Sequence, residues 1–260
     1  MERYPESGTD AQRNASPRLE CASCSDIGRV RVRNEDVLWA EPQHGWLVLS
    51  DGMGGYRGGD IAARLAVERI ERRLCDEGRD CDRRERLLDL LLAAVDDANA
   101  EIRRAGVMRP ELSGMGATVV VAAFLGAEMI CAHVGDSRLY RLRDGVLERL
   151  TRDHSLLQEQ IDAGMIHPGD IRGERLRGLL TRGLGVDLLV EPDIAVHEVC
   201  ADDLYLLCSD GLTDMVDDAE IAAELGGGGD LPEIARRLVA LANDYGGRDN
   251  VSVIVARPAA

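Results

Sequence analysis

The sequence predicts a single domain of the α+β class, a four-layer α-β-β-α sandwich in which helix pairs flank two antiparallel sheets. Several strand-like runs follow one another without a helix between them, which is the order expected of antiparallel sheets. Two other regions each carry a pair of segments with helix signals. At 260 residues and 45% hydrophobic content, the chain is long enough to bury one substantial core.

The N-terminal part predicts a tail followed by strands. Residues 1–17 are polar and are expected to form a disordered tail, so the folded domain is expected to span residues 18–257. Short extended pieces follow, and the apolar run 46–50 ends directly before Asp51. The chain therefore delivers a carboxylate at the end of a predicted strand.

The middle of the chain predicts a helix pair and then a meander of strands. Apolar residues recur at helical spacing over residues 59–77 and 83–104, which predicts two long amphipathic helices. Short runs rich in β-branched residues, separated by turns that contain glycine, then predict strands. These runs are residues 117–124, 129–134, 138–142 and 146–150.

The C-terminal half predicts three more helices and three more strands. Residues 164–188 are rich in Gly and Arg, show no sustained period and predict an irregular segment. Each helix start carries a capping residue followed three positions later by Gln or Glu. These pairs are Ser155 with Gln158, Asp217 with Glu220, and Asp230 with Glu233. The strands are expected at 189–199, 203–208 and 251–256.

Composition excludes several classes of function. The net charge is −16 and the sequence contains no lysine, which argues against binding to the phosphate backbone of nucleic acid. No run approaches the about 18 apolar residues of a membrane helix, and residues 1–17 lack the apolar region of a secretory signal. We therefore expect a cytoplasmic protein without membrane partners, whose seven cysteines are free thiols.

Short carboxylates gather in four segments, most of them at the end of a predicted strand or the start of a helix. Oxygen ligands of this kind suit hard divalent ions such as Mg²⁺ or Mn²⁺. The pattern predicts a metal-dependent hydrolase. The segments are Asn34–Asp36, Asp51–Gly55, Ser209–Asp214 and Asp249–Asn250.

The glycine-rich segment that follows Asp51 has two other interpretations. Gly52 has no side chain, so its carbonyl can approach an ion closely. A phosphate-binding nucleotide loop is disfavoured, because Arg57 occupies the last glycine position of that motif and no Gly-Lys-Ser/Thr is present. Taken alone, the segment is also compatible with a plain glycine turn.

Taken together, these motifs resemble the type 2C (PPM) family of metal-dependent Ser/Thr protein phosphatases, in its bacterial form. They follow the family order over nearly the whole chain, and the family fold agrees with the architecture predicted from the elements. The matching residues are Ser25–Arg31, Asn34–Asp36, Asp51–Gly55, Gly116–Thr118, Gly135–Arg138, Leu150–Thr151 with Asp153–Ser155, Leu180–Gly185, Ser209–Leu212 and Asp249–Asn250.

The resemblance implies a set of metal ligands. Asp51 would bridge two ions, and Asp210 and Asp249 would hold the first of them. Glu35 and the Gly52 carbonyl would lie around the second ion, partly through water. The implied cofactor is Mn²⁺ or Mg²⁺, and oxygen ligands accept either metal.

The resemblance also implies a third ion site and two catalytic residues. Asp136, together with Asp210 and Asp214, resembles the third metal site of bacterial members. Asp36 would orient a water held by the metal, and Arg31 would clamp the substrate phosphate. Two ions lower the pKa of a bridging water, so no protein nucleophile is needed.

The general acid is left open. Met53 stands where many eukaryotic relatives carry a histidine, and a thioether cannot protonate a leaving group. The alternatives are a water held by the metal, His154, or His167 in the irregular segment.

The predicted function is hydrolysis of phosphoserine and phosphothreonine in proteins, with a cognate bacterial Ser/Thr kinase as the opposing partner. Two alternatives stay open: a catalytically silent module that binds phosphoproteins or a kinase, and a hydrolase of small phosphate esters. Residues 164–188 correspond to the family's variable flap. Their arginines are expected either to attract a phosphopeptide or to make structural contacts; they include Arg172, Arg175, Arg177 and Arg182.

Overall fold

The computed structural model describes residues 18–53, 58–167 and 176–259 of the chain. The predicted disordered tail at residues 1–17 lies outside the described residues. So do the end of the Asp51–Gly55 segment and the flap arginines Arg172 and Arg175.

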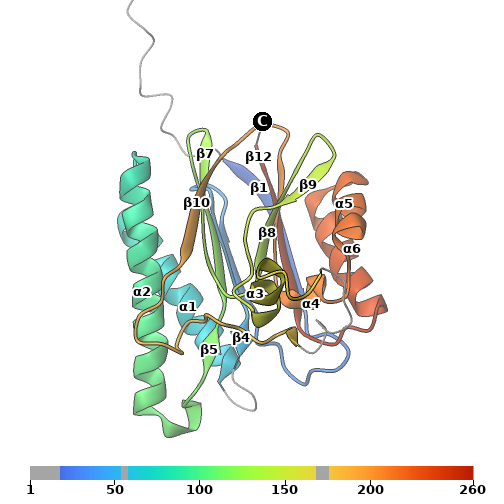
Figure 1. Ribbon diagram of the computed structural model, residues 1–260. Coiled ribbons are helices and arrows are strands. Elements are labelled where there is room, and N and C mark those ends of the chain that lie inside the picture. The colour runs from blue at the N-terminus through green and yellow to red at the C-terminus, as the bar shows by residue number, and fades with distance from the viewer. Residues whose placement is uncertain (1–17, 54–57, 168–175, 260) are drawn as a thin grey trace, which may run out of the picture.

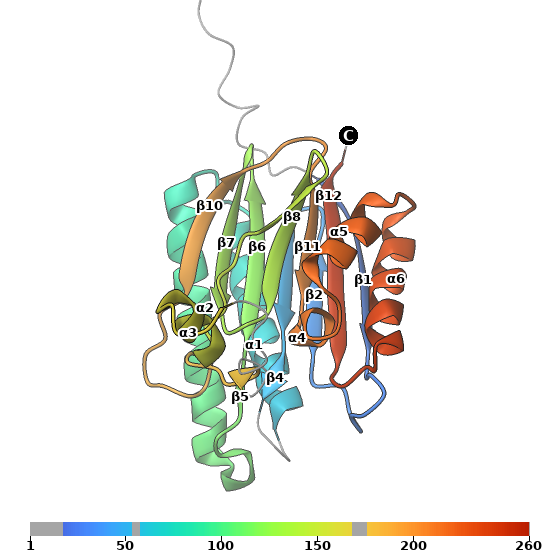
Figure 2. The same ribbon diagram turned by 45° about the vertical axis from the view of Figure 1, so that its right-hand side comes forward.

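Two five-stranded sheets form the centre of the molecule (Figures 1 and 2), and all neighbouring strands in them are antiparallel. The first sheet has the order β1 (Leu19–Asp26), β12 (Val251–Pro258), β11 (Leu204–Cys208), β8 (Arg138–Arg143) and β9 (Val146–Arg149). The second has the order β10 (Asp193–Glu198), β7 (Glu128–Val134), β6 (Val119–Leu125), β3 (Trp46–Ser50) and β2 (Val37–Glu41). A small ladder joins β4 (Gly52–Met53) to β5 (Gly116–Ala117).

Helix pairs cover the two outer faces of the sheets, as Figure 1 shows. Helices α1 (Gly59–Arg73) and α2 (Arg84–Met108) pack on the second sheet, and α5 (Asp218–Gly226) and α6 (Leu231–Asp244) pack on the first. Shorter segments are η2 (Leu74–Gly78), η3 (Pro110–Leu112), α3 (Leu156–Asp162) and α4 (Asp210–Thr213). The predicted four-layer α-β-β-α sandwich is confirmed. No helix among the described residues has the length and apolarity needed to cross a bilayer.

Strand β6 shows why this sequence needs four layers. Successive side chains of a strand point to opposite faces, and every residue of β6 is buried. Val119 and Val121 pack into the core beneath α1 and α2, whereas Val120 and Phe124 pack into the core between the sheets. A strand that is apolar on both faces must be covered on both faces.

The capping residues predicted from sequence begin their helices. Ser155 accepts a hydrogen bond from the backbone of Gln158 at 3.3 Å, which caps α3. Asp217 forms a reciprocal capping box with Glu220 at the start of α5, and Asp230 caps α6. Each cap satisfies a backbone N–H that the first turn of a helix leaves without a partner.

One strand is shorter than the sequence predicts. The expected run 189–199 becomes β10 only from Asp193 onward, directly after Pro192. Proline has no N–H to donate to a ladder, so the sheet edge begins behind it. Leu188 and Leu189, just before the strand, are exposed to solvent.

We expect the Phe124→Ala substitution to lower the free energy of unfolding by about 3–5 kcal/mol, because it leaves a cavity between the sheets. Phe124 is fully buried and meets Tyr205 of the other sheet edge to face, with ring centroids 5.1 Å apart. Urea unfolding of the variant measures the loss. Leu189→Ala, at a side chain that is 81% exposed, is the control and should change the value by no more than about 0.5 kcal/mol. Equal effects of the two substitutions would contradict this core assignment.

Candidate metal centre

Antiparallel pairing brings the predicted acidic segments to one end of the sandwich. Asp210 follows the end of β11, and Asp249 precedes the start of β12, which is the antiparallel neighbour of β11. Asp136 precedes β8, the antiparallel neighbour of β11 on its other side. Asp51 follows β3 in the facing sheet. These four junctions therefore lie at the same end of the two sheets.

A pocket of about 310 Å³ lies at this end of the molecule. It includes Arg31 and every predicted metal-ligand residue except Asp214. Asp36, the predicted water-orienting residue, does not line the pocket either. The lining residues are Arg31, Glu35, Asp51, Gly52, Met53, Thr118, Asp136, Gly178, Leu180, Asp210, Asp249 and Asn250.

Thr118 fixes the backbone of Asp51 in the second sheet. The Asp51 N–H donates to Thr118 Oγ1 at 3.0 Å, and the Thr118 N–H donates to the Asp51 carbonyl at 2.8 Å. Ser50 Oγ donates to the Thr118 carbonyl at 2.6 Å, and Thr118 Oγ1 lies 2.7 Å from Ser137 Oγ. The hydrogen bonds of Thr118 with Asp51 and Ser50 therefore join residues that are 67 and 68 positions apart in the sequence. The sequence motif contained Thr118 but gave no role for it.

Glycine is required at residue 52 because the packing there leaves no room for a side chain. A Cβ atom on Gly52 would lie 2.1 Å from the carbonyl oxygen of Gly59, at the start of α1. The Gly52 N–H donates to the Glu35 carbonyl at 3.2 Å, which joins two of the acidic segments. Any side chain at residue 52 would force α1 and this loop apart.

Asn250 holds the N-terminal acidic loop against β12. Its Oδ1 accepts the Glu35 N–H at 2.9 Å, and its Nδ2 donates to the carbonyls of Ile27 and Arg33 at 3.0 Å. The side chain thus uses its amide to order the loop that carries Arg31 and Glu35. Its place beside Asp249 in the sequence is the only signal that could have suggested this role.

Asp36 does not line the pocket, and its Oδ1 atom is buried. Its Oδ2 accepts a hydrogen bond from Ser209 Oγ at 2.8 Å. Burial raises the pKa of Asp36 to about 6, and hydrogen bonds from Ser252 and Ser209 oppose this shift. The carboxylate is therefore held in place by the strand end that also delivers Asp210.

Burial and mutual repulsion dominate the electrostatics of the centre. Burial, followed by the neighbouring carboxylates, holds the pKa of Asp51 and of Asp210 well above the usual range. The pKa of Asp136 rises to about 7 because the group is buried and lies near Asp153. A bound divalent cation would lower these pKa values, because its positive charge compensates the carboxylates.

The donor set fits hard divalent ions. Asp36 Oδ1 and Asp210 Oδ1 are buried, and neither accepts a hydrogen bond from the described part of the protein. Among the described residues, no three of the pocket carboxylates bring oxygen atoms within 4.8 Å of one another, so they line the pocket without meeting at one point, and Asp51, Asp210 and Asp249 would have to move closer together to share one ion. Carboxylate and carbonyl oxygens suit Mg²⁺ and Mn²⁺.

Arg31 reaches the pocket and pairs with Asp249. Its Nη2 donates to Asp249 Oδ2, and both side chains are partly exposed, at 50% and 33%. This hydrogen bond, with burial opposing it, raises the pKa of the guanidinium. The residue predicted to bind the substrate phosphate thus contacts a predicted metal ligand. To bind a phosphate, Arg31 would have to release the Asp249 carboxylate.

A second cluster lies outside the pocket. The described ranges hold one group of three His, Cys, Asp or Glu side chains whose possible ligand atoms all lie within 4.8 Å of one another. The group consists of His133, His154 and Asp193. His133 Nε2 lies 2.8 Å from the Arg152 carbonyl and must donate to it, because a carbonyl only accepts. His154 Nδ1 accepts the Gly135 N–H at 3.2 Å, so the neutral ring carries its proton on Nε2, 3.3 Å from Asp193. That proton occupies the position a metal would need, and each histidine already makes a backbone hydrogen bond through one of its ring nitrogens.

The pocket gives little support to a protein general acid. Met53 lines it, and its Cε lies 2.1 Å from where a Cβ on Gly183 would stand and 2.8 Å from one on Gly116. The thioether therefore packs against these two glycines. Neither His154 nor His167 lines the pocket. Burial lowers the pKa of His154 to about 4, with His133 adding to the shift.

The fold and the pocket together define a class of protein, the α-β-β-α sandwiches that carry a carboxylate-lined pocket at one end of their two sheets. Within that class, the chain belongs to the protein phosphatase 2C family, whose sequence model matches residues 29–250.

Named relatives resemble most of the chain. It is 40% identical over 242 residues to the serine/threonine protein phosphatase PstP of Mycobacterium tuberculosis, a match that covers 92% of this chain and 45% of that protein. It is 37% identical over 237 residues to the serine/threonine phosphatase stp of Listeria innocua, covering 89% of this chain and 92% of that protein. The chain thus spans about half the length of the mycobacterial relative, and nearly all of the other.

A solved structure supports the same relationship. The crystal structure of the PstP catalytic domain in complex with two manganese ions matches this fold with a TM-score of 0.82 at 39% identity. The match covers 92% of this chain and 97% of that one.

Proposed function

We propose that this protein is a Ser/Thr phosphoprotein phosphatase that uses Mn²⁺ or Mg²⁺. One observation carries the proposal: strand ends far apart in sequence bring partly buried carboxylates, which repel one another, around one pocket, with Arg31 at its edge. The names of the relatives and the manganese ions in the PstP structure support it. The proposal extends to the whole segment 18–257 as the catalytic domain, with a flap over 164–188.

In this proposal the acidic residues divide the metal-binding work. Asp51, Asp210 and Asp249 would hold a first ion, and Asp51, Glu35 and the Gly52 carbonyl would hold a second. Asp136 would provide a ligand for a third ion. When bound, the ions supply the Lewis acidity that activates water and neutralises phosphate charge.

The other residues bind and orient. Asp36 would orient the attacking water, from which it would accept a hydrogen bond or a proton. Arg31 binds the phosphate with two parallel N–H groups, and this adds positive charge where the transition state gathers negative charge. The Thr118 and Asn250 contacts keep Asp51 and Glu35 fixed, so that less reorganisation is needed when substrate binds.

Two flap arginines make structural contacts. Arg177 Nη1 lies 3.4 Å from Asp214 Oδ1, and Arg182 Nη1 donates to Asp193 Oδ1 at 2.7 Å. For these two, the contacts support the structural alternative to phosphopeptide attraction. The substrates we propose are phosphoproteins, the opposing partner is a Ser/Thr kinase, and the site of action is the cytoplasm.

A metal-dependence assay on two substrates tests the proposal. We expect turnover of p-nitrophenyl phosphate and of a phosphothreonine peptide with Mn²⁺, loss of both with EDTA, and a higher kcat/KM for the peptide. No metal-dependent turnover would favour the silent binding module. A preference for small phosphate metabolites over the peptide would favour a hydrolase of small esters.

We expect Arg31→Ala to lower kcat/KM by about 10- to 100-fold, the value of a charge-assisted hydrogen bond to phosphate. Steady-state kinetics on the phosphothreonine peptide measure the change. Arg33→Ala is the matched control, because Arg33 is exposed on the same loop and does not line the pocket. If both variants lost activity equally, loop charge rather than phosphate contact would be the cause.

A further inference from the structure

A buried amide stands in the second half of α2. Asn99 is 3% exposed and lies on the helix face that packs on the second sheet, one turn after Val95 and one turn before Ile102. An apolar residue would fit the periodic pattern of that face. A polar side chain in such a place lowers stability unless its groups have hydrogen-bond partners. The partners of Asn99 therefore explain why an amide stands there.

The whole amide group of Asn99 is used on one loop, residues 185–188. Its Oδ1 accepts the Gly185 N–H at 2.7 Å. Its Nδ2 donates to the carbonyls of Asp187 and Leu188 at 3.1 and 3.3 Å. An amide offers two N–H groups and one carbonyl, so all three of these groups serve to hold the loop on α2.

The side chains of the loop contribute little to its attachment. Val186, Leu188 and the following Leu189 are 57%, 74% and 81% exposed, so they are not packed into the core. Arg103 adds one hydrogen bond, from its Nη1 to the Val186 carbonyl at 3.3 Å, on the exposed surface of α2. Among the side chains that the structure describes, Asn99 is thus the buried anchor of this loop.

The loop is connected to the metal centre by backbone pairing. Leu184, directly before the loop, exchanges two hydrogen bonds with Ala117 of β5, at 2.8 and 3.1 Å. Ala117 is in turn the antiparallel partner of Gly52 in β4. Gly52 lines the metal pocket, and its carbonyl is the proposed ligand of the second ion. A displacement of the loop would therefore reach Gly52 through two backbone pairings.

We propose that Asn99 is a positioning residue of the metal centre, which holds the Gly52 carbonyl in place through the loop and through the pairing of β5 with β4. The inference rests on the proposed metal ligands. Groups that orient a metal ligand from outside raise metal affinity, because less ordering is left for the binding step. The Gly52 N–H also donates to the Glu35 carbonyl at 3.2 Å, so loss of the Asn99 contacts should weaken metal binding without abolishing it.

Metal binding to the full chain tests the inference without any need for turnover. Asn99→Leu keeps the size of the side chain and removes its three hydrogen bonds, and we expect it to weaken Mn²⁺ binding about fivefold or more. Isothermal titration calorimetry measures the affinity. Gly185→Ala displaces the same loop from its own side, since a Cβ there would lie 2.4 Å from Ile102 Cγ2 and the φ of 85° disfavours alanine. It should weaken Mn²⁺ binding in the same way.

Hydrogen exchange of the metal-free protein, followed by mass spectrometry, shows whether the effect reaches β5. In Asn99→Leu, we expect exchange about tenfold faster or more at the amides of Leu184, Gly185 and Ala117. The amides of β11 should exchange at the wild-type rate. Because no metal is present, this measurement supports or contradicts the coupling even if the wild type proved to bind no Mn²⁺, a result that would contradict the proposed function instead.

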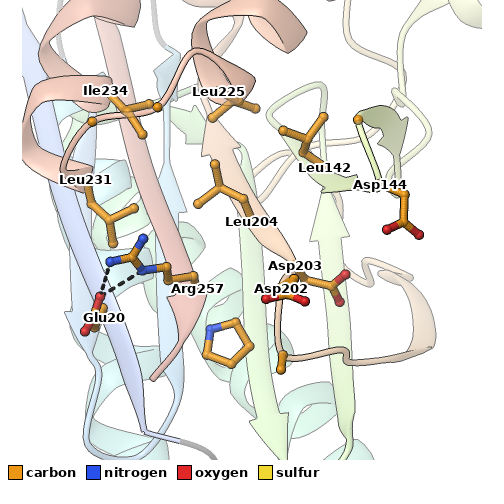
Figure 3. Close-up of a pocket in the computed structure, with 15 residues that line it drawn as sticks. Glu20, Leu142, Asp144, Asp202, Asp203, Leu204, Leu225, Leu231, Ile234 and Arg257 are labelled. Atoms are coloured by element: carbon orange, nitrogen blue, oxygen red, sulfur yellow. Dashed lines mark hydrogen bonds and ion pairs between the residues drawn. The ribbon is translucent and has the colours of Figure 1, made fainter. Parts of the chain in front are cut away.

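Two core substitutions control for lost stability. Leu87→Ala removes a buried side chain from the same helix, about 18 Å before Asn99 at 1.5 Å per residue. Leu225→Ala does so on α5, beside a pocket that Pro258 places at the opposite end of the first sheet from the metal centre (Figure 3). Both should lower the midpoint of urea unfolding and leave Mn²⁺ affinity within about twofold of the wild type.

Two outcomes would overturn the inference. One is an Asn99→Leu protein that folds and binds Mn²⁺ as tightly as the wild type. The other is equal weakening of Mn²⁺ binding by Asn99→Leu and Leu87→Ala, which would make lost helix stability the cause. If Asn99→Leu does not fold, Gly185→Ala decides the question by the same two comparisons.

Discussion

We expect Asp210→Asn to fold and to lose Mn²⁺-dependent turnover by about a thousandfold or more. Asp210 lies two residues after the end of β11, and its buried Oδ1 atom has no hydrogen-bond partner among the described groups. Replacing its carboxylate with an amide removes one negative charge and one strong oxygen ligand from the pocket. Initial rates on p-nitrophenyl phosphate over a Mn²⁺ titration measure the loss, and calorimetry measures metal affinity.

Asp89→Asn is the matched control for this substitution. Asp89 is exposed on α2, so the same chemical change there should leave turnover and metal affinity unchanged. Circular dichroism should show that both variants fold. Full activity of Asp210→Asn at saturating Mn²⁺ would remove Asp210 from the proposed ligands and with it the arrangement in which Asp51, Asp210 and Asp249 share an ion.

The meeting of the acidic residues at one pocket could be predicted because it depends on chain topology. A carboxylate at a strand end is recognisable from sequence, and antiparallel pairing decides which strand ends meet. Asp210 after β11 and Asp249 before β12 are neighbours for this reason. The run that forms β6, rich in β-branched residues, was likewise predicted as a strand.

The support around the ligands could not be predicted in the same way. Thr118 fixes Asp51, and Asn250 fixes Glu35 across 215 residues, through single side-chain hydrogen bonds. Such bonds depend on distances of a few tenths of an ångström, which no sequence period encodes. The requirement for Gly52 is similar, since the obstacle is the backbone of Gly59. The contact of Arg31 with Asp249 was also absent from the sequence expectations.

The second large effect concerns the stability of the metal-free protein, which we expect to fall as pH rises. Burial raises the pKa of Asp36 to about 6 and of Asp136 to about 7, against an ordinary value of 3.8. The folded state therefore binds protons that the unfolded state has released. Stability from these groups is present below about pH 4 and is lost as pH rises through 6 and 7. Asp51 and Asp210 shift in the same direction.

Asp210→Asn separates this charge repulsion from other pH effects. In EDTA at pH 8, we expect the variant to be more stable than the wild type by on the order of 1–3 kcal/mol, because one buried unpaired charge is gone. The difference should shrink at pH 5.5, where the wild-type site holds protons. His154, whose pKa is lowered to about 4, destabilises both proteins below pH 6.5 and cancels in the comparison.

Manganese should reverse the order of the two proteins at pH 8. The ions compensate the wild-type carboxylates and stabilise only the folded state, whereas Asp210→Asn binds them weakly and gains less. Urea unfolding at pH 5.5 and 8, with EDTA or Mn²⁺, gives the four values for each protein. A metal-free wild type more stable than Asp210→Asn at pH 8 would mean that these carboxylates do not repel one another. A centre that is destabilising without metal and stabilising with it is what a pocket built to hold cations requires.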